Sequence, residues 1–178
     1  GAGPGLAWNW IVLLGAGEVA PLALESPTDW QVFQRRDCTE GEVRLRGRAP
    51  AGSDCVVATI RARRPALVFA PHVETAAGMI LPDDYLRAVA DAVHEVGGLF
   101  VLDCIASGAM WVNMQATGVD VLVSAPQKGW SSSPCCAMVM LSERARTAID
   151  GTTSTSFACD LRKWLQIPAD SKRGDDRW

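Results

Sequence analysis

Short apolar runs alternate with helical patterns between residues 54 and 124, and this order limits the chain to one class of fold. The apolar runs cover residues 66–70, 99–102 and 119–123. Between the first two runs, Leu86 and Val93 belong to a set of apolar residues that recur at helical spacing. Strands that alternate with helices form parallel sheets joined by right-handed crossovers. The sequence therefore predicts an α/β fold with a mostly parallel sheet flanked by helices.

The flanks of this pattern carry weaker signals. Residues 10–14 and 137–141 each predict a buried strand, and a helix is expected directly after the second of them. Glycines at positions 15 and 17 suggest a nucleotide-binding turn only weakly, because Pro21 interrupts the helix that should follow. From residue 168 onward the chain is polar and without pattern, which is typical of a frayed tail.

Composition excludes several classes of function. A net charge of -3 gives no electrostatic reason to bind nucleic acid or an anionic membrane. The six cysteines include no Cys-x-x-Cys pair, and His72 and His94 do not form a metal-binding pair. No apolar run is long enough to span a bilayer, and residues 8–14 lack the basic leader of a signal peptide. We expect a cytoplasmic protein that has reduced thiols and binds small metabolites.

Asp103 and Lys128 each follow one of the predicted strands. Functional groups of α/β proteins collect beyond the carboxyl ends of the strands. A lysine can form a Schiff base with an aldehyde, and a carboxylate can keep the ring nitrogen of pyridoxal phosphate protonated. The pair therefore fits a pyridoxal phosphate site. Spacing alone equally allows a surface lysine and a capping aspartate.

Three motifs around this pair resemble the class V aminotransferases in order and spacing. They are HVETAAG at residues 72–78, VLDCIAS at 101–107 and SAPQKG at 124–129. The resemblance covers about residues 55–167 and is greatest to the alanine–glyoxylate or serine–pyruvate branch. These are pyridoxal-phosphate enzymes of fold type I, so the resemblance implies part of the large domain of such an enzyme.

The resemblance also implies a role for each site residue. Lys128 would be the catalytic residue, which binds the cofactor aldehyde covalently and later moves a proton. Asp103 would pair with the ring nitrogen, and Ile105 would press against a ring face. Gln127 would reach the phosphate, and Thr75 would lie near the phenolic oxygen. Ordinary structural roles remain open for the last three: a core side chain, a backbone hydrogen bond and a strand-end contact.

Four other residues near the motifs are assigned no direct cofactor contact. His72 and Glu74 are expected to help shape the end of a strand. Trp111 and Trp130 are expected to pack rather than to stack on the cofactor. No metal ligand is predicted.

The resemblance divides the chain into three parts. Residues 1–52 match the family poorly, and its glycine-rich phosphate loop cannot be aligned there. Residues 53–167 are expected to form a partial pyridoxal-phosphate-binding α/β domain, and residues 168–178 a disordered tail. The family's C-terminal domain, which contains the arginine that binds the substrate carboxylate, would follow residue 167. We therefore expect a fragment.

The predicted activity is amino transfer from alanine or serine to a 2-oxo acid such as glyoxylate or pyruvate. The resemblance implies a homodimer, because sites in this family lie at a subunit interface. Two alternatives stay open. One is a truncated, non-catalytic domain derived from an aminotransferase, and the other is a lyase or desulfurase on the same scaffold.

Overall fold

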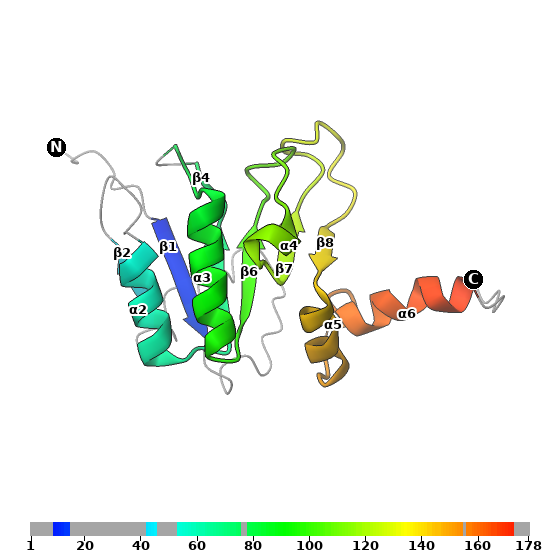
Figure 1. The fold of residues 1–178 in the computed structure, drawn as a ribbon. Helices are drawn as coiled ribbons and strands as arrows, with labels where there is room; N and C mark the ends of the chain where they lie inside the picture. Colours follow the sequence, from blue (N-terminus) through cyan, green and yellow to red (C-terminus); the bar gives the residue numbers. More distant parts are fainter. Residues whose placement is uncertain (1–8, 15–41, 46–52, 76–77, 155, 173–178) are drawn as a thin grey trace.

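The structure is a computed structural model that describes residues 9–14, 42–45, 53–75, 78–154 and 156–172. At its centre lies a six-stranded sheet in the order β2-β1-β3-β6-β7-β8 (Figure 1). The strands are β1 (Asn9–Leu14), β2 (Glu42–Leu45), β3 (Leu67–Pro71), β6 (Leu99–Asp103), β7 (Val121–Ser124) and β8 (Met138–Leu141). A short hairpin of β4 (Val73–Glu74) and β5 (Met79–Ile80) forms a separate two-stranded sheet.

The centre of the six-stranded sheet is parallel. β3 pairs with β6 and β6 pairs with β7, both in parallel, whereas β1, β2 and β8 make antiparallel pairs at the two sides. The α/β class predicted from the alternating pattern is thus confirmed. The parallel strands are the ones whose connections contain helices, as the crossover rule requires.

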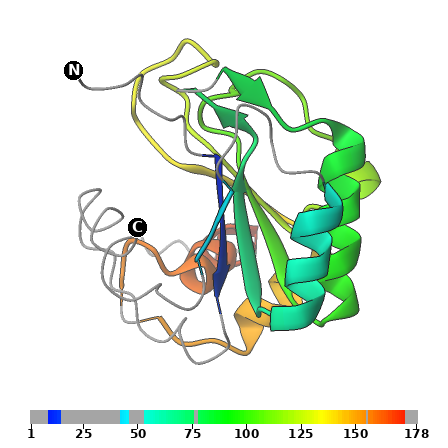
Figure 2. The ribbon, with the colours of Figure 1, turned by 90° about the vertical axis from the view of Figure 1, so that its left-hand side faces the viewer.

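Helices cover one face of the sheet. These helices are α2 (Ser53–Arg63), α3 (Asp83–Glu95) and the short α4 (Met114–Thr117). Two more helices, α5 (Glu143–Asp150) and α6 (Leu161–Lys172), follow β8 and are not part of this layer. Figure 2 shows α2 and α3 lying side by side against the strands. Leu86 and Val89 of α3 are fully buried in one cluster with Phe100 and Leu102 of β6. The core therefore lies between this helical layer and the sheet.

Glycines end two of the helices. Gly97 has φ +86 after α3, and Gly118 has φ +75 as the C-cap of α4. A left-handed residue at this position lets the chain leave the helix at once. The chain can thus turn directly from α3 into β6 and from α4 toward β7.

Two details differ from the prediction. The strand expected at residues 137–141 exists as β8, but it is only half-buried and Met140 is 38% exposed. Among the described strands β8 pairs only with β7, so the expectation of a buried strand was wrong. The helix α6 also continues to Lys172, past the start of the polar tail expected from residue 168.

The strand expected at residues 10–14 is present as β1. The glycine turn at residues 15–17 lies outside the described residues. None of the described helices is long and apolar enough to cross a membrane.

Candidate active site

The three parallel strands end at one edge of the sheet, and the predicted site residues follow them there. Pro71 of β3 is opposite Asp103 of β6, and Asp103 is opposite Val123 of β7. Lys128 lies four residues beyond Ser124, the last residue of β7. The structure thus brings Asp103 and the segment that carries Lys128 to the same edge, beyond the carboxyl ends of adjacent strands.

The carboxylate of Asp103 is half-buried and anchors its own turn. Its Oδ1 accepts a hydrogen bond of 2.8 Å from the backbone N–H of Ile105. The backbone oxygen of Asp103 accepts another, also 2.8 Å, from the N–H of His72. Oδ2 has no hydrogen-bond partner among the described residues. One carboxylate oxygen is therefore fixed in place, and the other can accept a hydrogen bond from a ligand.

His72 lies next to Asp103 on the adjacent strand end and is only 4% exposed. Its ring Nδ1 has no hydrogen-bond partner within the described part of the chain. Burial lowers the pKa of His72 below 6.5, although the charge of Asp83 and a hydrogen bond to the backbone oxygen of Leu81 oppose the shift. The ring is therefore neutral at pH 7. The sequence indicated its place after a strand, but not its burial or its unpaired nitrogen.

Lys128 lies in a tight loop and is exposed. Its backbone oxygen accepts a hydrogen bond of 3.1 Å from Ser131, and the oxygen of Pro126 accepts one of 3.0 Å from Ser132. The ammonium group itself has no hydrogen bond or ion pair with any described residue. The loop backbone is thus ordered by its own hydrogen bonds, while the amine stays accessible.

The remaining predicted residues lie around the same edge. Ile105 is half-buried in the turn after β6, and Gln127 is exposed beside Lys128. Thr75 is exposed in the turn between β4 and β5. Gln127 and Thr75 make no side-chain hydrogen bonds within the described ranges, so their polar groups are available to a ligand.

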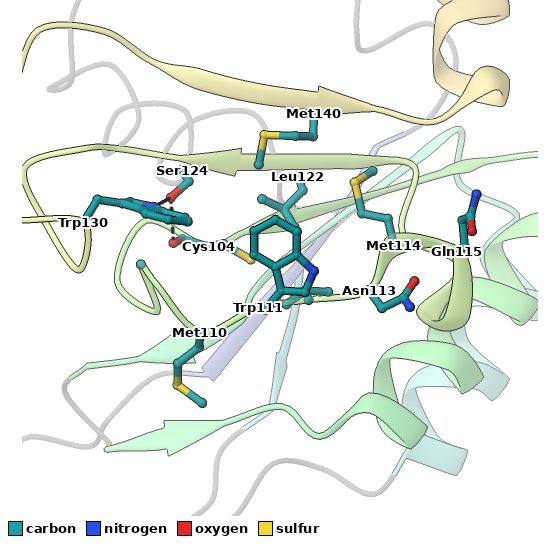
Figure 3. Close-up of a pocket in the computed structure, with 12 residues that line it drawn as sticks. Cys104, Met110, Trp111, Asn113, Met114, Gln115, Leu122, Ser124, Trp130 and Met140 are labelled. Atoms are coloured by element: carbon teal, nitrogen blue, oxygen red, sulfur yellow. Dashed lines mark hydrogen bonds between the residues drawn. The ribbon is translucent and has the colours of Figure 1, made fainter.

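An apolar cavity of about 330 Å³ adjoins the Lys128 loop (Figure 3). Its walls include Leu122, Met140, Trp111 and Trp130, and neither Asp103 nor Lys128 lines it. Trp111 is 85% exposed, so the expectation that it packs was wrong; the indole of Trp130 is held by a hydrogen bond to Ser124. No cluster of three or more metal-binding side chains occurs among the described residues.

No family model matches the sequence, but individual proteins are clearly similar. A 2-aminoethylphosphonate–pyruvate transaminase of Paraburkholderia phymatum is 32% identical over 133 residues, which are 74% of this chain and 35% of that protein. The alanine–glyoxylate aminotransferase of Oryctolagus cuniculus is 29% identical over 107 residues, 58% of this chain and 26% of that protein.

A solved structure shows the same fold. The ureidoglycine–glyoxylate aminotransferase of Bacillus subtilis superposes with a TM-score of 0.58 at 26% identity, covering 64% of this chain and 30% of the other. The chain is a relative of the class V aminotransferases. The resemblance seen in the three motifs is confirmed, and so is the fold, which is that of the fold type I pyridoxal-phosphate enzymes. The chain spans about a third or less of the length of these aminotransferases.

Proposed function

We propose that this chain forms the cofactor-binding part of a pyridoxal-phosphate-dependent aminotransferase. The observation that carries the proposal is the position of Asp103 at the carboxyl end of β6 and of Lys128 just beyond the end of the adjacent parallel strand β7. An acid and an amine at this edge, in a chain similar to named aminotransferases, match what the cofactor requires.

The donor and acceptor groups at this edge fit the cofactor. The open Oδ2 of Asp103 can accept a hydrogen bond from a protonated ring nitrogen, and the exposed amine of Lys128 can react with an aldehyde. The amide of Gln127 and the hydroxyl of Thr75 are free to donate hydrogen bonds to a phosphate and to a phenolic oxygen. Ile105 offers an apolar side chain for a ring face.

Pyridoxal phosphate supplies an aldehyde for covalent attachment and a ring that withdraws electrons from the substrate. Lys128 would hold the cofactor through its amine, and the same amine would act as the base for the α-carbon proton of the amino acid. Asp103 would hold a proton on the ring nitrogen, because a negative charge beside it would stabilise the protonated form. The bond from Ile105 to Oδ1 keeps the carboxylate from rotating away.

The proposed amino donor is a small amino acid such as alanine or serine, and the acceptor is glyoxylate or pyruvate. Two of the named relatives act on glyoxylate and one on pyruvate, so small 2-oxo acids recur among them. We further propose a homodimer as the active assembly, which sedimentation of the purified chain would measure.

Covalent trapping on the full chain tests the cofactor proposal. The chain is incubated with pyridoxal phosphate and reduced with borohydride, and peptide mass spectrometry then locates the pyridoxyl group. We expect the group on Lys128. The chain has only two other lysines, so Lys163→Ala is a matched control that should label normally, whereas Lys128→Ala should not. Label elsewhere, or none, would contradict the proposal.

Turnover separates the proposed activity from its alternatives. Alanine with glyoxylate should yield pyruvate and glycine, and Lys128→Ala should abolish the reaction. A chain that traps the cofactor on Lys128 but shows no turnover would be the truncated, non-catalytic domain. Release of ammonia or sulfide from an amino acid, without glycine formation, would identify a lyase or desulfurase.

A further inference from the structure

We infer that Gly108 and Gly129 are positioning residues, which set Lys128 relative to Asp103 through direct contact of their backbones. The inference rests on the proposed function, because it concerns the same lysine and the same acid. It assigns a role to two residues that have no side chain with which to take part in the reaction.

The two glycines leave no room for a side chain at their contact. A Cβ atom on Gly108 would lie 2.2 Å from Cα and 2.6 Å from N of Gly129. A Cβ on Gly129 would lie 2.6 Å from Cα of Gly108 and 2.8 Å from N of Ala109. All of these atoms are backbone and cannot rotate away. Only glycine at both positions allows the two loops to approach this closely.

Each glycine belongs to a segment that carries one of the two reactive groups. Gly108 ends the turn that Asp103 begins, and its N–H donates a hydrogen bond of 3.0 Å to the oxygen of Cys104. Gly129 follows Lys128 directly. The contact therefore joins the turn that begins at Asp103 to the residue that follows Lys128.

A second link holds the same loop on the other side of Gly129. The indole N–H of Trp130 donates to Ser124 Oγ at 3.0 Å, and this hydroxyl donates to the oxygen of Cys104 at 3.3 Å (Figure 3). Ser124 ends β7, and Cys104 follows Asp103. Lys128 thus lies on a loop that is tied at both ends to the two strands of the site.

Adding one methyl group would move this loop. A Cβ on Gly129 at 2.6 Å must retreat by roughly 1 Å to reach ordinary van der Waals contact. A misplacement of about 1 Å in a reacting group can lower a rate on the order of 100-fold. The effect should therefore appear at Lys128, although the substitution leaves its side chain unchanged.

Gly129→Ala is the decisive variant, and Gly151→Ala is its matched control. Gly108 has φ +53, so alanine there would add backbone strain to crowding, whereas Gly129 has no positive φ. At Gly151 a Cβ meets only the oxygen of Ala148 at 3.6 Å, an ordinary contact. We expect Gly129→Ala to raise at least tenfold the pyridoxal phosphate concentration needed for half-maximal trapping on Lys128. The pH profile of trapping should shift as well, while Gly151→Ala matches the wild type.

Trp130→Phe tests the second link and does not depend on how Gly129→Ala folds. It removes one hydrogen bond without adding bulk, and we expect a smaller loss of trapping, about threefold to tenfold. Circular dichroism checks the fold of every variant.

The two proposals fail in different ways. If the wild-type chain does not trap the cofactor on Lys128, the proposed function is wrong. If the wild type traps it and both Gly129→Ala and Trp130→Phe trap it at the same concentration and with the same pH profile, the positioning inference alone is overturned.

Discussion

Each of the residues at the carboxyl edge of the sheet forms hydrogen bonds through one of its polar groups and keeps another polar group available. Asp103 uses Oδ1 to accept from Ile105, and Lys128 is fixed through its backbone oxygen while its amine is accessible. His72 is held through its N–H and C=O, and its ring Nδ1 is unpaired among the described residues. Rigid backbones with available side-chain atoms are what a ligand site requires.

Asp103→Asn separates the charge of this residue from its structural bond. Asparagine keeps an oxygen that can accept from the Ile105 N–H, so the melting temperature should change by only a few degrees. It cannot hold the proton on the ring nitrogen, so we expect trapping on Lys128 to persist and amino transfer to fall about 100-fold or more. Steady-state kinetics and borohydride trapping measure the two effects. Unchanged turnover would rule out the proposed role of the carboxylate.

Cys104 should be less reactive than Cys135, Cys136 and Cys159. It is 2% exposed, and burial raises the pKa of its thiol to about 11. At pH 8 only about one in a thousand Cys104 side chains would be in the thiolate form. Cys135, Cys136 and Cys159 are exposed, so iodoacetamide should label them first, as read by peptide mass spectrometry. Labelling in urea is the control, and there the difference should disappear.

His72 should make stability depend on pH. Because burial lowers its pKa in the folded chain, the unfolded chain binds the proton more readily. Its contribution is complete above pH 6.5 and is lost as the pH falls through 6.5 toward the lower folded value. Urea unfolding at pH 7.5 and pH 5.5 measures the loss, which should be smaller in His72→Asn. An identical pH dependence in both proteins would contradict the assignment.

At the scale of elements, one buried residue ties the opposite edge of the sheet together. Asp120 is 2% exposed, and its Oδ2 accepts from the N–H of Phe100 at 2.9 Å and lies 2.8 Å from Nε2 of His94. Its Oδ1 accepts from the hydroxyl of Ser142 at 3.0 Å. Asp120 thus connects β6, the end of α3 and the start of α5.

Asp120→Ala should therefore destabilise the fold strongly. It leaves the buried N–H of Phe100 and the hydroxyl of Ser142 without their acceptor, and we expect a loss of about 3–5 kcal/mol in the free energy of unfolding. Asp91→Ala on the exposed side of α3 is the control and should change it by less than about 0.5 kcal/mol. Urea denaturation gives both values. A loss below about 1 kcal/mol would show that these bonds contribute little.

Local pattern predicted the elements well where one face of each is buried. The strands β3, β6 and β7 and the helix α3 were predicted from the spacing of their apolar residues. Burial of those residues on one face is what stabilises each element. The exposure of β8 did not follow, because its composition is that of a core strand and only its place at the sheet edge leaves it half-open. Asp120 was missed because its partners come from three distant segments.

The same limit applies to the candidate site. Strand ends and residue type made Asp103 and Lys128 candidates, and the three motifs gave them their predicted roles. The contact of Gly108 with Gly129 could not be predicted, because it depends on the path of two loops 21 residues apart in sequence (129 − 108). The unpaired Nδ1 of His72 likewise depends on packing that no local pattern describes.

At the scale of the whole molecule, the site is built from loops that extend directly from the central strands. Asp103 is the last residue of β6, whose Phe100 and Leu102 are fully buried in the core, and β7 carries the Lys128 loop on its end. A ligand that contacts the ends of both β6 and β7 is therefore linked directly to the buried core. Binding at this edge should stabilise the entire fold.

Thermal unfolding with and without pyridoxal phosphate measures this coupling. A ligand at 100 times its dissociation constant adds about 2.7 kcal/mol to the stability of the folded state. For a chain of 178 residues this corresponds to a rise of about 5–10 °C in melting temperature. Lys128→Ala should lose most of the rise, because the covalent bond is gone, while Lys163→Ala keeps it. Pyridoxamine phosphate has no aldehyde and cannot bond to Lys128. With the wild-type chain it should therefore give only the small rise in melting temperature that pyridoxal phosphate gives with Lys128→Ala. An equal rise in all of these cases would mean that the cofactor binds without Lys128.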